Sequence, residues 1–183
     1  MTALPQIRMT VDEFLAWASN QPGRYELHNG IVYAMSPEAA GHAETKFAVQ
    51  TALAAAIRER NLPCHMLPDG MTVRIDETTA YEPDALVYCG TKLASNAVEV
   101  ADPIIVVEVL SPSTERVDHS AKLAGYFRLA SVAHYLIVEP SEPLIVHHAR
   151  GPGEDILTRI VREGSIVLDP PGLELVADIY GGM

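Results

Sequence analysis

The chain has 183 residues, of which 48% are hydrophobic and 20% are charged, and these proportions are typical of a globular domain rather than a disordered chain. Its 24 acidic and 13 basic residues give a formal charge of −11. This charge excludes a protein that coats phosphate backbones through a general basic field. It still allows a local site in which carboxylates hold a metal ion against a phosphate.

Composition also bears on the location of the chain. No run of about 18 apolar residues is present, so we expect no transmembrane helix, and residues 1–10 lack the apolar segment of a secretory signal. Cys64 and Cys89 do not form a CxxC pair, so we expect two small buried side chains rather than a disulfide or a zinc site. A reducing, cytoplasmic location follows from this interpretation. Without repeats or long linkers, residues 1–183 are expected to form a single domain.

The N-terminal third predicts a helix, a hairpin and a long helix. Thr10 and Glu13 fit a capping box, which marks the start of a helix. Asn29-Gly30 separates two β-prone runs, as expected for a hairpin turn. An Ala-rich segment with apolar residues at helical spacing predicts the longest helix. The expected bounds are 11–19 for the first helix, 24–28 and 31–35 for the hairpin strands, and 42–60 for the long helix.

The rest of the chain predicts strands around one more helix. The segment 104–110 is almost wholly apolar, which indicates a central strand buried on both faces. Other strands are expected at 71–75, 85–88, 134–139, 144–148 and 157–161, with a helix at 118–129. Leu173, Leu175, Val176 and Ile179 are expected to pack back onto the body. This order predicts an α/β (α+β) fold with a mixed sheet.

Glu108 is the most informative single residue. A carboxylate within a β-branched strand loses its hydration, which costs several kcal/mol unless the group is paired or bound to a metal. Asp84 begins another apolar strand, and the two carboxylates could hold one divalent cation, Mg²⁺ or Mn²⁺ rather than zinc. The residues alone equally allow Glu108 to pair with an Arg or Lys and to do nothing else.

Three polar residues on the helix that follows add to this pattern. Asp118, Lys122 and Tyr126 are spaced by four residues, so they share one helix face. Lys122 could reach the carboxylates and stabilise a charged transition state. The alternative is an ordinary ion pair between Asp118 and Lys122 on the helix surface.

Together these motifs resemble the Uma-type family of restriction-endonuclease-like proteins, over nearly the whole chain and in order. The matching segments are 9–15, 24–27, 29–30, 35–37, His42, Pro83-Asp84, the stretch from Val107 to Thr114, Asp118, Lys122, Tyr126 and 134–138. The resemblance implies a PD-(D/E)XK nuclease fold. That fold has a central mixed β-sheet flanked by helices, here with an N-terminal helix and hairpin.

The resemblance also implies roles for individual residues. Asp84 and Glu108 would be the catalytic acids and would bind Mg²⁺ or Mn²⁺ together with the backbone carbonyl of Val109. The superfamily expects a Lys two residues after the acid, where this chain has Leu110, and Lys122 is expected to take its place as the third catalytic residue. The residues expected to support the cleft are Glu26, His42, Asp118 and Tyr126.

The leading hypothesis is a Mg²⁺-dependent endonuclease that hydrolyses DNA, because a divalent ion lowers the pKa of bound water and neutralises phosphate charge. A second hypothesis is a catalytically silent module of the same fold with an interaction or regulatory role. A third is a hydrolase of a small phosphoester. The resemblance makes a homodimer plausible. His147 and His148 are adjacent in a predicted strand, so their side chains are expected on opposite faces.

Overall fold

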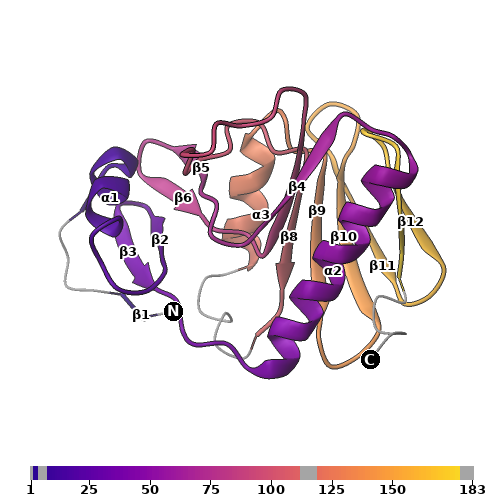
Figure 1. Cartoon of the computed structure of the whole chain (residues 1–183), viewed down its shortest axis with the longest axis horizontal. Coiled ribbons are helices and arrows are strands. Elements are labelled where there is room, and N and C mark those ends of the chain that lie inside the picture. The colour runs from indigo at the N-terminus through magenta and orange to yellow at the C-terminus, as the bar shows by residue number, and fades with distance from the viewer. Residues whose placement is uncertain (1, 4–7, 112–118, 178–183) are drawn as a thin grey trace.

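The computed structural model describes residues 2–3, 8–111 and 119–177, and Figure 1 shows how they are arranged. In chain order its elements are β1 (Thr2–Ala3), α1 (Val11–Ala18), β2 (Tyr25–His28), β3 (Ile31–Ala34), α2 (Ala40–Glu59), β4 (Cys64–Pro68), β5 (Val73–Asp76), β6 (Thr79–Tyr81), β7 (Ala85–Cys89), β8 (Ile105–Val109), α3 (His119–Arg128), β9 (His134–Glu139), β10 (Leu144–Arg150), β11 (Ile156–Val161), β12 (Ser165–Leu168) and β13 (Leu173–Val176). The predicted mixture of helices and strands is therefore confirmed.

The strands form a central mixed sheet and two smaller sheets. The central sheet has six strands in the order β11-β10-β9-β8-β7-β4. Its β8 and β9 run parallel and its other neighbours run antiparallel. A five-stranded sheet has the order β1-β3-β2-β6-β5, and β12 pairs with β13 alone.

Helices cover both faces of the central sheet, as the sequence predicts for its innermost strand. Figure 1 shows α2 lying across one face, where its apolar residues share a core with residues of β12 and β13. On the other face α3 packs between the central and five-stranded sheets, and Tyr126 contributes to that second core. All five residues of β8 are buried, which confirms a strand buried on both faces.

The N-terminal unit forms for the local reasons that its sequence indicates. The side-chain oxygen of Thr10 accepts from the backbone of Glu13, and the Glu13 carboxylate accepts from the backbone of Thr10. Asn29 and Gly30 adopt positive φ angles of 50° and 79°, as a tight hairpin turn requires. The capping box and the hairpin are both confirmed.

Five short strands were not predicted: β1, β4, β6, β12 and β13. The segment β4 carries no alternation of apolar and polar residues, and β6 has only three residues, so periodicity cannot reveal them. Leu173 and Leu175 are buried as expected. Val176 lies on the outer face of β13 with 59% of its surface exposed, so its expected packing is wrong, and Ile179 lies outside the described residues.

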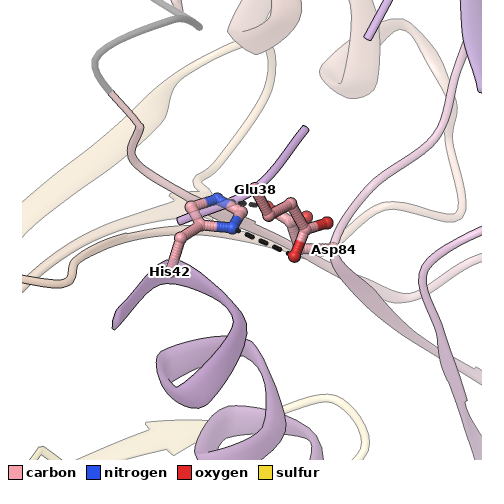
Figure 2. Close-up of side chains that lie close together, drawn as sticks. All are labelled: Glu38, His42 and Asp84. Atoms are coloured by element: carbon pink, nitrogen blue, oxygen red, sulfur yellow. Dashed lines mark ion pairs between the residues drawn. The ribbon is translucent and has the colours of Figure 1, made fainter. Parts of the chain in front are cut away.

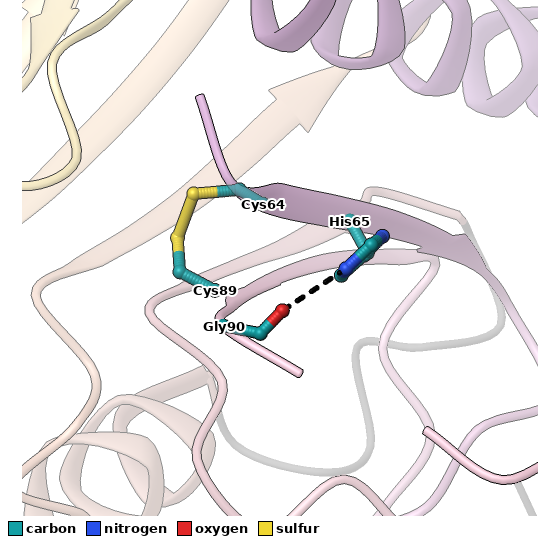
Figure 3. Close-up of a disulfide and its surroundings, with 4 residues drawn as sticks. All are labelled: Cys64, His65, Cys89 and Gly90. Carbon is teal, nitrogen blue, oxygen red and sulfur yellow. Dashed lines mark hydrogen bonds between the residues drawn. A yellow bond between two sulfur atoms is a disulfide. The ribbon is translucent and has the colours of Figure 1, made fainter. Parts of the chain in front are cut away.

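The expectation of two separate, reduced cysteines is wrong. Cys64 and Cys89 form a disulfide, shown in Figure 3. The physical reason is the pairing of β4 with β7, whose antiparallel register places Cys64 directly opposite Cys89. Because β4 was not predicted, the spacing of 25 residues gave no sign of this contact.

None of the helices in the described residues combines the length and hydrophobicity needed to cross a lipid bilayer.

Candidate functional site

Two buried carboxylates meet where β7 begins and β8 ends. Ala85 of β7 lies opposite Val107 of β8, and the amide of Asp84 donates to the Val107 carbonyl over 2.9 Å. This register places Asp84 beside the end of β8 that carries Glu108. Oδ2 of Asp84 accepts a 2.8 Å hydrogen bond from the backbone N–H of Val109, which fixes the orientation of its carboxylate.

A lysine and a tyrosine from α3 contact Glu108. Lys122 Nζ donates to Glu108 Oε1 over 2.8 Å, and the Tyr126 hydroxyl donates to the same oxygen over 2.8 Å. Nζ of Lys122 also lies 2.9 Å from Oε1 of Glu26 on β2. The expected face shared by Lys122 and Tyr126 is confirmed. Since Lys122 is only 5% exposed, the alternative of a surface ion pair is wrong.

The first turns of α2 bring a histidine and a second lysine to Asp84. His42 Nε2 lies 3.8 Å from Asp84 Oδ2 and 3.0 Å from the carbonyl oxygen of Val109. Lys46 Nζ lies 3.7 Å from Asp84 Oδ1 and also contacts Glu38 and Asp69. Figure 2 shows His42 with one ring nitrogen facing Glu38 and the other facing Asp84, which lie on the same side of the ring.

These side chains border one cavity of about 690 Å³. Its lining includes four carboxylic residues and two permanently cationic ones, together with His42. The charged residues that line it are Arg24, Glu26, Glu38, Asp84, Glu108 and Lys122. If all four carboxyl groups are ionised, one divalent cation would balance the charge of this set.

Burial dominates the electrostatics of the site. It raises the pKa of Glu26, Asp84 and Glu108, because a buried carboxylate loses hydration, and Lys122 offsets only part of this effect. Burial also works against the charge of Lys122, but the attraction of Glu108 and Glu26 outweighs it and raises the pKa of Lys122. The ammonium group therefore stays charged among three carboxyl groups. A further cation would favour their ionised forms.

The structure brings together six of the residues expected at the site: Glu26, His42, Asp84, Glu108, Lys122 and Tyr126. The backbone of Val109 contacts both Asp84 and His42. Asp118 lies outside the described residues.

Four further charged residues at the site were not predicted: Arg24, Glu38, Lys46 and Asp69. Lys46 carried a usable signal, because His42, Lys46, Val49 and Leu53 follow the helical spacing of one buried face of α2. The other three precede or follow regular elements, where no periodicity places a side chain. Arg24 contacts Asp69 and donates from Nε to Glu82 over 3.0 Å.

Several donors at this site suit a divalent cation. Side-chain atoms of Glu38, His42 and Asp84 lie within 4.8 Å of one another. Glu26 Oε2 is buried and has no hydrogen-bond partner within the described part of the chain. Carboxylate and carbonyl oxygens are ligands that Mg²⁺ and Mn²⁺ prefer. The donor set therefore fits such an ion.

The chain is similar to known proteins over most of its length. The sequence model of the Uma2 family, described as "Putative restriction endonuclease", matches residues 11–179. An uncharacterized protein, slr1290, from Synechocystis sp. is 26% identical over 182 residues, which is 98% of this chain and 95% of that protein. The crystal structure of "a putative nuclease belonging to DUF820" from Anabaena variabilis aligns with a TM-score of 0.73 at 13% identity. That alignment covers 94% of this chain and 98% of the other, and it confirms the predicted restriction-endonuclease-like fold.

Proposed function

Because the chain belongs to the Uma2 family, described as "Putative restriction endonuclease", we propose that it is a divalent-metal-dependent nuclease that hydrolyses DNA phosphodiester bonds. The observation that carries this proposal is the position of Asp84 and Glu108. Glu108 lies in β8 and Asp84 directly precedes the neighbouring strand β7. Both are buried and line one cavity, where Lys122 contacts Glu108. Fixed carboxylates repel the phosphates of DNA. Their concentration at a site of phosphodiester hydrolysis is therefore useful only if a cation binds between the carboxylates and the phosphate.

Asp84, Glu108 and the carbonyl of Val109 are the groups that would hold the ion. When bound, Mg²⁺ or Mn²⁺ would supply a Lewis acid for the phosphate and lower the pKa of water in the cavity. The residues present do the positioning. The amide of Val109 fixes Asp84, and the Tyr126 hydroxyl fixes Glu108. Lys122 places a permanent positive charge beside the reacting phosphate, where negative charge develops.

This assignment explains part of the acidity of the chain. Four carboxyl groups line the cavity, and without a cation they would repel a phosphate. A bound divalent ion would balance this charge, so that the DNA phosphate would no longer meet a net negative site.

Cleavage of supercoiled plasmid tests the proposal. We expect cutting with Mg²⁺ or Mn²⁺ and none with a chelator. Asp84→Asn and Glu108→Gln should each lower the rate by more than about 100-fold, the upper range for loss of a residue that only supports a metal ligand. Asp102→Asn is the matched control, because Asp102 is an exposed aspartate outside the cavity.

Two results would contradict the proposal. Unchanged cutting by both site variants would mean that a contaminant or another site is responsible. A plasmid that stays uncut with both Mg²⁺ and Mn²⁺ would favour the catalytically silent module. Calorimetric titration with Mg²⁺ is a second way to distinguish the nuclease from the silent module. A nuclease must bind the ion at this site, whereas a silent module need not.

A further inference from the structure

His42 lies where the proposed metal ligands converge. Its imidazole is buried, with 9% of its surface exposed, on the first turn of α2. Nε2 faces two oxygen atoms, 3.0 Å from the carbonyl of Val109 and 3.8 Å from Oδ2 of Asp84. The carbonyl and the carboxylate are both groups that the proposed function assigns to the cation.

The other ring nitrogen faces a carboxylate. Nδ1 of His42 is buried and has no hydrogen-bond partner among the described residues, but it lies 3.6 Å from Oε2 of Glu38 (Figure 2). Glu38 is itself held in place, because its Oε1 accepts from Lys46. Its second oxygen is thereby left facing the histidine.

We propose that His42 binds the divalent cation through Nε2, and that Glu38 is the positioning residue that fixes the histidine for this role. The inference rests on the proposed function, since it adds a nitrogen ligand to the same site. Histidines that bind metals usually donate their other N–H to a carboxylate or carbonyl, which sets the tautomer and the ring orientation. Glu38, His42 and Asp84 have the arrangement that this rule requires.

The proton balance of the imidazole is simple. A carbonyl oxygen only accepts, so the contact with Val109 places a proton on Nε2. For Nε2 to hold an ion, that proton would leave to water, and a proton on Nδ1 would be donated to Glu38.

A nitrogen ligand also predicts ion selectivity. An imidazole favours Mn²⁺ over Mg²⁺, because Mg²⁺ prefers an all-oxygen shell with retained waters. We therefore expect the intact chain to bind Mn²⁺ more tightly than Mg²⁺. His42→Gln should reduce this preference by about 10-fold, the lower range for loss of a group that supports a metal site.

The test uses Mn²⁺ alone as the probe, with pulsed electron paramagnetic resonance to detect a directly bound ¹⁴N nucleus. The intact chain should show histidine nitrogen coupling. His42→Gln should lose the coupling, although the amide can still donate to Val109, so a purely structural hydrogen bond would be preserved. His65→Asn is the matched control, because His65 contacts the carbonyl of Gly90 outside the cavity. Glu38→Gln should keep the coupling and weaken Mn²⁺ binding about 10- to 100-fold.

The outcomes distinguish failure of the metal-binding role of His42 from failure of the proposed nuclease function. Bound Mn²⁺ without nitrogen coupling, or coupling that persists in His42→Gln, would overturn the role of His42 and leave the nuclease proposal standing. Unchanged Mn²⁺ affinity in Glu38→Gln would overturn the role of Glu38. If the intact chain binds neither Mn²⁺ nor Mg²⁺, both this inference and the proposed function are wrong.

Discussion

Lys122 Nζ lies 2.8 Å from Oε1 of Glu108, so the cation of α3 is fixed directly on the carboxylate of β8. The chain has three lysines, and two of them, Lys46 and Lys122, are buried beside the carboxyl groups of the cavity. Lysine is therefore used mainly inside this protein rather than on its surface. The two ammonium groups hold together a site that would otherwise be strongly acidic.

Lys122→Met should abolish plasmid cleavage and lower stability. Breaking a buried ion pair by removing one partner costs about 3–5 kcal/mol, because the remaining charge is uncompensated. Glu26 and Glu108 already have raised pKa values, and in the variant they can regain stability by taking up protons as the pH falls. The loss measured by urea unfolding should therefore be smaller at pH 5.5 than at pH 7.5.

Lys92→Met is the matched control, because Lys92 is exposed outside the cavity. It should change stability by less than about 0.5 kcal/mol at either pH. Equal losses in the two variants would contradict a special role for Lys122.

A glycine on α3 sets the distance between that helix and β6. A Cβ atom added at Gly125 would lie 2.9 Å from Cε2 of Tyr81, whose ring also has Lys122 Nζ 5.4 Å from its centroid. Gly125→Ala should therefore destabilise the protein by about 1–3 kcal/mol, the cost of overpacking, although alanine is the better helix former. Thermal unfolding measures the change.

The exposed alanine next to it provides the opposite control. Ala124→Gly should cost about 1 kcal/mol through helix propensity alone. If Gly125→Ala stabilises the chain, then Tyr81 moves freely and the close approach of helix and strand is not required.

The site residues that the sequence revealed share one property, which is that a local pattern made them conspicuous. Glu108 interrupts an apolar run, and Lys122 and Tyr126 lie one helical turn apart. Asp84 begins a strand. Sequence spacing could not show that Glu108 contacts Lys122 directly, because that contact depends on how α3 packs against β8.

The residues that the sequence did not reveal depend on tertiary contacts. Asp69 follows β4, a strand without a recognisable period, and reaches the site only because Arg24 and Lys46 contact it. The disulfide depends on the same strand. The opposite orientation of two adjacent histidines needed only the period of two residues: His147 contacts His134, and His148 contacts Thr158.

Reduction of the disulfide should destabilise the fold without removing the proposed site. Cys64 and Cys89 close a loop of 25 residues, and such crosslinks contribute about 2–4 kcal/mol. Cys89 is at the end of β7 opposite to Asp84, so Mn²⁺ affinity should be unchanged. Urea unfolding with and without reductant measures the loss. A variant with both cysteines replaced by alanine should not respond to reductant, and a response there would assign the effect to another cause.

DNA association should require a divalent ion and should weaken with salt. The formal charge of −11 gives the metal-free chain no attractive field for phosphate. We expect no change in the fluorescence anisotropy of labelled DNA with chelator present. With Mn²⁺ present, the intact chain should bind the labelled DNA. Asp84→Asn is the control and should not bind the DNA under the same conditions. Strong binding by the metal-free protein would point to a separate basic surface.

Acid should destabilise the protein through a buried histidine pair on β9 and β10. His134 Nδ1 lies 2.9 Å from His147 Nε2, and both rings are buried. Burial, followed by the neighbouring His134 and Arg159, lowers the pKa of His147 to about 4 from 6.5. As the pH falls, His147 is therefore protonated in the unfolded chain before it is protonated in the folded protein. The contribution of neutral His147 to the free energy of unfolding is complete above pH 6.5 and is lost as the pH falls toward 4.

The free-energy difference between the intact chain and His147→Gln should shrink from pH 7.5 to pH 5. The cost of Val146→Ala, next to it in β10, should stay constant. A difference for His147→Gln that is equally large at both pH values would mean that the pair does not titrate on unfolding.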